Sequence, residues 1–117
     1  MALNEISYRQ LLNCMKACSK IDSLTTDSLD LRCYMFNPDW KEGVALAKYR
    51  DGAGNDVYFI FKNNSVLAKG FDHESEVSRH AREDYEIWPG MYHGVPHFLL
   101  EELNDDALME EDVTFCF

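Results

Sequence analysis

The feature that most constrains the fold is a short apolar run in the middle of the chain, bounded by turn-forming residues. Residues 57–61 read Val-Tyr-Phe-Ile-Phe and are apolar at odd and even positions alike. Successive side chains of a strand point to opposite faces of a sheet, so such a run is typical of a central strand covered on both faces. We therefore predict a strand at residues 56–62 with structure packed on each side of it.

The residues around this run predict a meander of antiparallel strands. Asn63-Asn64 suits a two-residue hairpin loop, because asparagine tolerates positive φ, and the Asp-Gly-Ala-Gly-Asn stretch at 51–55 predicts a second turn. Asn37-Pro38 is a turn signal that would end an earlier, aromatic-rich strand. The strands are expected at residues 31–36, 44–50, 56–62 and 65–69.

An amphipathic helix is predicted before the strands. Apolar residues recur at helical spacing between Asn4 and about Lys20. Two starts fit this pattern, because Asn4 is a good N-cap and Ser7 stands at capping-box spacing from Gln10.

The chain changes character after Gly70. The following stretch is polar, rich in histidine and interrupted by Pro89-Gly90, which favours a long structured loop or short helical turns. Aromatic side chains are expected to anchor this loop to the core, namely Phe71, Trp88 and Tyr92. Pro96 suits the first turn of a helix that runs to about Asn104, and residues 114–117 suit a final strand.

These elements define an α+β fold with an N-terminal helix, an antiparallel sheet meander, a C-terminal helix and a final strand. A chain of 117 residues suits one hydrophobic core, so we expect a single domain over 1–117. The N-terminus lacks the basic start and apolar segment of a secretory signal, and no stretch approaches the roughly 20 apolar residues of a membrane helix. We therefore expect a cytoplasmic protein with no membrane association.

The charge is divided unevenly along the chain. Residues 1–82 hold 11 acidic and 11 basic residues, whereas residues 83–117 hold ten acidic residues and neither lysine nor arginine, so the whole net charge of −10 lies in the last third. Such a field repels phosphate backbones, which disfavours direct binding of nucleic acid, and it attracts basic surfaces. A solvated acidic face that only maintains solubility is the plainer interpretation of the same charge.

Histidines and cysteines are the remaining residues that suggest chemistry. His73, His80, His93 and His97 crowd the polar loop, but their spacing matches no helix-borne ligand pair. The four cysteines, Cys14, Cys18, Cys33 and Cys116, are expected to be small buried hydrophobic residues in a reducing compartment. We therefore assign no catalytic residue, metal ligand or cofactor, and we expect a binding protein and not an enzyme.

A family resemblance adds to this interpretation. The C-terminal part carries Gly70-Phe71-Asp72-His73-Glu74-Ser75, Ser78, Trp88-Pro89-Gly90, Val95-Pro96 and Glu111-Asp112-Val113-Thr114-Phe115-Cys116. This spacing over residues 70–117 resembles immunity proteins of bacterial polymorphic-toxin loci, including those of contact-dependent growth inhibition systems. The resemblance implies a protein that binds and neutralises one cognate toxin, commonly a nuclease domain, and within that class an EndoU-type RNase is the expected partner. The chain departs from the pattern by ending at Phe117, where the pattern often continues past the cysteine.

The leading hypothesis is thus an immunity protein whose acidic surface covers the basic cleft of a toxin nuclease. The expected toxin-binding residues are Asp72, Glu74, Asp84, Glu86, Glu101, Glu102, Asp105 and Asp106. Two alternatives stand beside it. One is a small metal-binding or hydrolytic domain that uses the region of His73, His80, His93 and His97, and the other is an adaptor unrelated to toxins.

Overall fold

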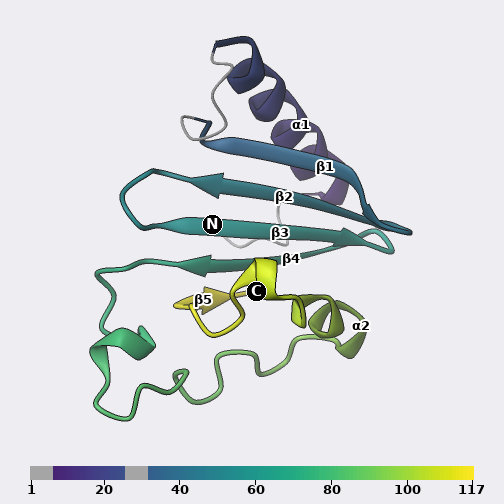
Figure 1. The fold of residues 1–117 in the computed structure, drawn as a ribbon. Helices are drawn as coiled ribbons and strands as arrows, with labels where there is room; N and C mark the ends of the chain where they lie inside the picture. The colour runs from purple at the N-terminus through teal and green to yellow at the C-terminus, as the bar shows by residue number, and fades with distance from the viewer. Residues whose placement is uncertain (1–6, 26–31) are drawn as a thin grey trace.

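The computed structural model describes residues 7–25 and 32–117. Figure 1 shows a helix, α1, on one side of a five-stranded sheet and a region of short helices on the other. The strands follow one another across the sheet in chain order, each antiparallel to its neighbour. They are β1 (Tyr34–Lys41), β2 (Val44–Arg50), β3 (Asp56–Lys62), β4 (Ser65–Phe71) and β5 (Phe115–Cys116). This is the α+β meander that the sequence predicts.

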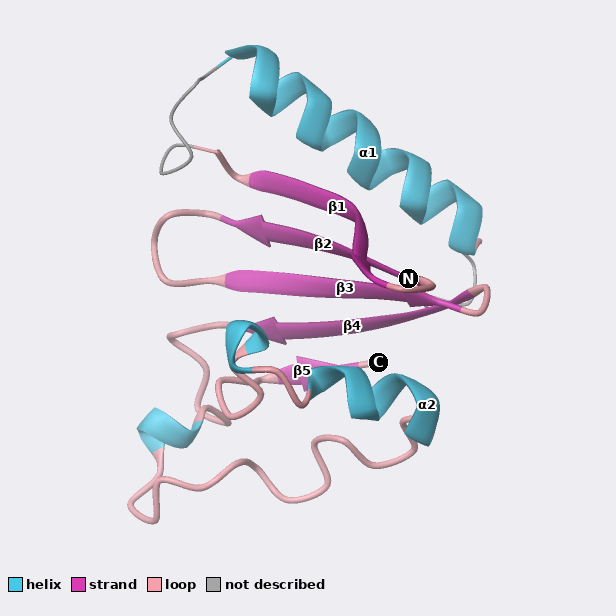
Figure 2. Cartoon of the chain, turned by 45° about the vertical axis from the view of Figure 1, so that its right-hand side comes forward, coloured by secondary structure: helices cyan, strands magenta, loops and turns pink. Residues whose placement is uncertain are grey.

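The apolar run occupies the central strand, β3, and both faces of the strand are covered as predicted. On one face, Phe61 packs with Ala47 of β2 against Met15 of α1. On the other face, Tyr58 and Ile60 are buried beneath the C-terminal region by Leu99, Leu103 and Leu108. Figure 2 shows these two layers on opposite sides of the sheet.

Helix α1 spans Tyr8–Thr25 and begins with the capping box that its sequence suggests. The Ser7 hydroxyl accepts a hydrogen bond from the Gln10 amide at 3.1 Å, and the Ser7 amide donates to Gln10 Oε1 at 3.0 Å. The other candidate cap, Asn4, lies outside the described residues. The predicted end near residue 20 is wrong, because the polar residues that follow bond within the helix: the Thr25 hydroxyl donates to the Asp22 carbonyl at 3.0 Å.

The predicted end of the first strand is also wrong. β1 continues through Asn37-Pro38 to Lys41, with a register shift between Asn37 and Lys41. β1 is an edge strand, so the amide that Pro38 lacks costs the sheet few ladder bonds, and an irregular pairing accommodates the ring. Leu31, the predicted first residue, lies outside the described residues.

The hairpin loop between β3 and β4 is confirmed. Asn63 and Asn64 have φ values of 51° and 57°, the left-handed conformation that a two-residue hairpin loop of this type requires.

The polar stretch after β4 forms a loop with short helical turns, as expected, and includes η3 (Arg79–Ala81). Tyr92 does anchor it, because its ring packs against the core and its hydroxyl donates to the Glu110 carbonyl. Phe71 is half-buried, with its ring 5.8 Å from that of His80. Trp88 is 43% exposed, so its predicted anchoring role is wrong: its ring stacks on the Arg82 guanidinium at 5.2 Å.

The predicted C-terminal helix is present as two short pieces. α2 (His97–Leu100) follows Pro96 and continues as η4 (Glu101–Leu103), after which η5 (Asp106–Leu108) leads towards the final strand. None of the helices in the described ranges is long and apolar enough to cross a membrane.

The expectation of buried cysteines is wrong. Cys14 is exposed, and Cys18, Cys33 and Cys116 are only partly buried. On α1 the neighbouring Met15 takes the fully buried position, which turns Cys14 away from the sheet.

Candidate functional site

The two acidic residues of η4, Glu101 and Glu102, form ion pairs with a lysine of the sheet. Lys62, at the end of β3, places its ammonium 3.0 Å from Glu101 Oε1 and 2.9 Å from Glu102 Oε1, and it donates to the Phe98 carbonyl at 3.0 Å. The hydrogen bonds to Glu102 and Glu101 raise the pKa of Lys62, and the hydrogen bond from Lys62 lowers the pKa of Glu101. These two predicted binding residues therefore fasten the helical region to the sheet.

Asp105 and Lys41 extend this arrangement. Lys41 Nζ lies 3.5 Å from Glu102 and 3.8 Å from Asp105. Asp105 is also the N-cap of η5, since its carboxylate accepts from the Ala107 amide at 2.9 Å. The Asp105 side chain thus has a structural role.

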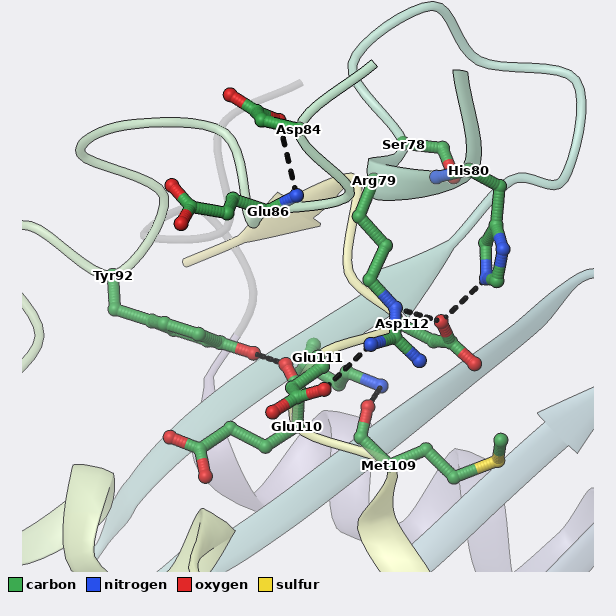
Figure 3. A network of polar contacts seen from close by, with 11 residues as sticks. Ser78, Arg79, His80, Asp84, Glu86, Tyr92, Met109, Glu110, Glu111 and Asp112 are labelled. Atoms are coloured by element: carbon green, nitrogen blue, oxygen red, sulfur yellow. Dashed lines mark hydrogen bonds and ion pairs between the residues drawn. The ribbon is translucent and has the colours of Figure 1, made fainter. Parts of the chain in front are cut away.

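Arg79, the first residue of η3, joins the loop to the last acidic run (Figure 3). Its Nε donates to Asp112 Oδ1 at 3.1 Å and its Nη1 to Glu111 Oε2 at 2.5 Å, while His80 Nε2 lies 2.8 Å from the same Asp112 oxygen. Burial alone would raise the pKa of Asp112, but the hydrogen bonds from His80 and Arg79 lower it below its usual value.

Two adjoining hollows flank Arg79 and Glu111, which line both. The first has a volume of about 320 Å³ and is lined chiefly by polar residues between Leu103 and Asp112, including Asp105, Asp106 and Glu110. The second, of about 360 Å³, is lined by Arg79, Tyr85, Glu86, Ile87 and Glu111. We call this double concavity the acidic hollow.

The acidic hollow holds carboxylates that make no close contact with a cation of the described part of the chain, although Glu86, after Asp84, helps to raise the pKa of Arg82. Among the residues that the structure describes, the side chains of Glu86, Asp106 and Glu110 make no ion pair and no hydrogen bond. A group of like charges in a concave surface focuses its field outward, towards a cationic ligand.

The remaining predicted residues, Asp72, Glu74 and Asp84, line neither part of the acidic hollow. Asp84 pairs with Arg82 at 3.0 and 3.1 Å, and this hydrogen bond lowers the pKa of Asp84. Asp72 accepts from the Glu74 amide at 3.0 Å, and Glu74 lies 3.7 Å from the His73 ring. Of the eight predicted residues, the structure therefore brings Glu86, Asp105 and Asp106 to the acidic hollow.

Among the charged and aromatic residues that line the acidic hollow, sequence reasoning missed five: Arg79, Tyr85, Glu110, Glu111 and Asp112. The acidic run 110–112 was a visible signal, because it continues the charge asymmetry. Nothing in the local sequence around Arg79 indicates that it meets residues more than 30 positions away.

A buried lysine positions the acidic run from below. Lys69 of β4 is 1% exposed, and its ammonium donates to the carbonyls of Leu108 at 2.9 Å and Met109 at 2.7 Å. Burial lowers the pKa of Lys69 to about 8. These bonds fix the turn from which Glu110 and Glu111 extend.

The four histidines have separate surroundings. His73 contacts Asn55 at 2.7 Å, His80 contacts Asp112, and His97 lies 3.8 Å from Glu101, while His93 is exposed. Within the described ranges, no three of the histidine, cysteine and acidic side chains are placed to hold a metal ion. Burial raises the pKa of Cys116 to about 11, which disfavours the thiolate that a nucleophile needs.

Comparison of the chain with protein-family models, curated proteins and solved structures gives no match.

Proposed function

We propose that this chain is an immunity protein that binds and neutralises a cognate bacterial toxin, a basic nuclease domain, through the acidic hollow. The observation that carries the proposal is the set of unpaired carboxylates of Glu86, Asp106 and Glu110 in a concave surface. Crowding like charges costs free energy through their mutual repulsion. A basic partner relieves that cost.

The geometry suggests how neutralisation works. A nuclease cleft is lined by cations that bind substrate phosphates, and the acidic hollow offers carboxylates in their place. Binding of this kind requires no catalytic residue on the inhibitor. Long-range attraction also raises the association rate, which suits a protein that must reach its toxin before the toxin reaches RNA.

The test is calorimetry and stopped-flow kinetics against any toxin domain encoded beside this gene, together with an assay of its nuclease activity. We expect a one-to-one complex, loss of nuclease activity and an association rate that falls as salt is added. The combined Asp106→Asn and Glu110→Gln variant should associate more slowly. Glu42→Gln is the control for the loss of a single charge elsewhere, because Glu42 is an exposed acid in the part of the chain whose charges sum to zero.

Two outcomes would overturn the proposal. If the association rate changed neither with salt nor in the combined Asp106→Asn and Glu110→Gln variant, the interface would lie elsewhere on the protein. Absence of any complex, with stoichiometric zinc or iron bound by the protein as isolated, would favour the metal-binding alternative.

A further inference from the structure

One exposed aromatic ring lines the acidic hollow, and a second lies three residues further along the same loop. Tyr85 is 52% exposed and lines the hollow next to Glu86, and Trp88, three residues further on, is 43% exposed. Tyrosine and tryptophan are enriched at protein interfaces, where a rigid ring covers a large area at little cost in conformational entropy. The position of Tyr85 beside the unpaired carboxylate of Glu86, with Trp88 exposed on the same loop, therefore points to an interface with a definite chemistry.

The backbone at Tyr85 is held in a defined conformation. Tyr85 has a φ of 56°, which a residue with a side chain adopts only at some cost in free energy. The segment is held by hydrogen bonds from the Tyr85 amide to the Arg82 carbonyl at 3.3 Å and from the Glu86 amide to Asp84 Oδ1 at 3.1 Å.

Each ring already stacks on an arginine of the same chain. The Arg79 guanidinium lies 4.4 Å from the Tyr85 ring centre, and the Arg82 guanidinium lies 5.2 Å from that of Trp88. Each of these guanidinium groups also meets a carboxylate, Arg79 at Glu111 and Arg82 at Asp84. The loop thus contains two examples of a guanidinium held between a ring and a carboxylate.

We propose that Tyr85, which lines the acidic hollow, and Trp88, on the same loop, are aromatic anchors that select arginine side chains of a basic protein partner. This inference rests on the proposed function and adds to it a preference for arginine over lysine. A guanidinium is flat and weakly hydrated, so it stacks on a ring while it pairs with a carboxylate, whereas an ammonium remains strongly hydrated. The unpaired carboxylates of Glu86 and Glu110 supply the second half of that recognition.

The experiment compares oligoarginine with oligolysine of equal length and charge, measured by titration calorimetry with the full chain. We expect oligoarginine to bind more tightly, by roughly two- to fivefold for each ring that stacks. Tyr85→Ala and Trp88→Ala should each remove their part of this preference and leave oligolysine binding nearly unchanged. The combined Asp106→Asn and Glu110→Gln variant should weaken both peptides alike.

Two controls keep the result interpretable. Leu24→Ala removes an exposed apolar side chain of α1, 78% exposed, and should change neither affinity. Trp88 fluorescence in a Trp40→Phe background reports stacking directly, without loss of the ring, and should change with oligoarginine and little with oligolysine.

The outcomes separate the two proposals. Equal affinities for both peptides, unchanged by the ring substitutions, would overturn the selection of arginine and leave the acidic interface standing. If neither peptide bound, the acidic hollow would not attract basic chains, and the proposed function, which depends on that attraction, would be contradicted. Tight binding of the cognate toxin domain by the Tyr85→Ala and Trp88→Ala variants, equal to that of the unmodified chain, would likewise exclude these rings as anchors.

Discussion

Lys69 is a buried lysine that holds the turn at Leu108 and Met109 by hydrogen bonds. It is fully buried, it bonds two neutral carbonyls, and its ammonium lies 5.1 Å from the Tyr58 ring centre. Asp56, Asp112 and Cys116 favour its charge, while Lys48 opposes it. Burial outweighs these contributions and lowers its pKa, so the fold carries this charge at a cost in stability near neutral pH.

The stability of the protein should therefore depend on the protonation of Lys69. Its pKa is about 8 in the folded state, against about 10.4 for an unfolded lysine. Between these values the unfolded chain binds more protons, so the free energy of unfolding rises with pH. Measured by urea denaturation, the wild type should gain about 1 kcal/mol over Lys69→Met between about pH 8 and 9.

Cys116 acts in the opposite direction from about pH 8 upward, but both proteins contain it, so most of its contribution cancels in the difference between wild type and Lys69→Met. Burial raises the pKa of its thiol to about 11, so the unfolded chain releases that proton first and stability falls with pH. A difference between wild type and Lys69→Met that stays flat from pH 7 to 9 would contradict the assignment.

Gly70 is required by close packing. A Cβ at this position would lie 1.9 Å from the Phe115 ring, which β5 lays against β4. Gly70→Ala should reduce the free energy of unfolding by roughly 1–3 kcal/mol, the range for overpacked sites. In a Phe115→Ala background the same substitution should cost almost nothing, and an undiminished cost there would show that the backbone, not the ring, excludes the methyl group.

At the scale of elements, the capping box is the clearest local determinant. Ser7→Ala removes the acceptor of the Gln10 amide and should lower the free energy of unfolding by about 1 kcal/mol, measured by chemical denaturation. Ser19→Ala, within the same helix, is the control and should have a much smaller effect. Alanine has the higher helix propensity, so equal losses for the two variants would mean that the loss at Ser7 does not come from the cap.

The elements that were predictable are those whose determinants are local. Residues 57–61 specify a doubly covered strand, and Asn63-Asn64 specify its hairpin, because strand period and positive φ are properties of adjacent residues. The end of β1 was not predictable from Asn37-Pro38 alone, because the consequence of a proline depends on whether its strand lies at an edge.

The candidate site was less predictable for the same reason. Charge counting indicates an acidic surface, but it cannot separate acids that bind lysines of the sheet from acids that remain unpaired. Glu101 and Glu102 meet Lys62, which lies about 40 residues earlier in the chain, so only the folded structure reveals their role. Glu110 also belongs to a run of acidic residues, and it differs from Glu101 and Glu102 only in what surrounds it in the folded chain.

At the scale of the whole molecule, the net charge of −10 opposes folding, and salt should relieve that opposition. Raising the ionic strength from about 0.01 M to 0.15 M shortens the screening length from about 30 Å to 8 Å, which weakens repulsion among exposed carboxylates. The pairs of Lys62 and Arg79 are partly buried and are screened less. The melting temperature should therefore rise with sodium chloride.

Charge reversal in the acidic hollow should separate stability from function. Asp106→Lys and Glu110→Lys each remove one repelling carboxylate and should raise the melting temperature at low salt, on the order of 1–3 °C. The same variants should bind oligoarginine several-fold more weakly. Glu42→Lys makes an equal change of charge away from the hollow and should leave that affinity much less affected. If both hollow variants gained stability and kept their affinity, the acids would serve solubility alone.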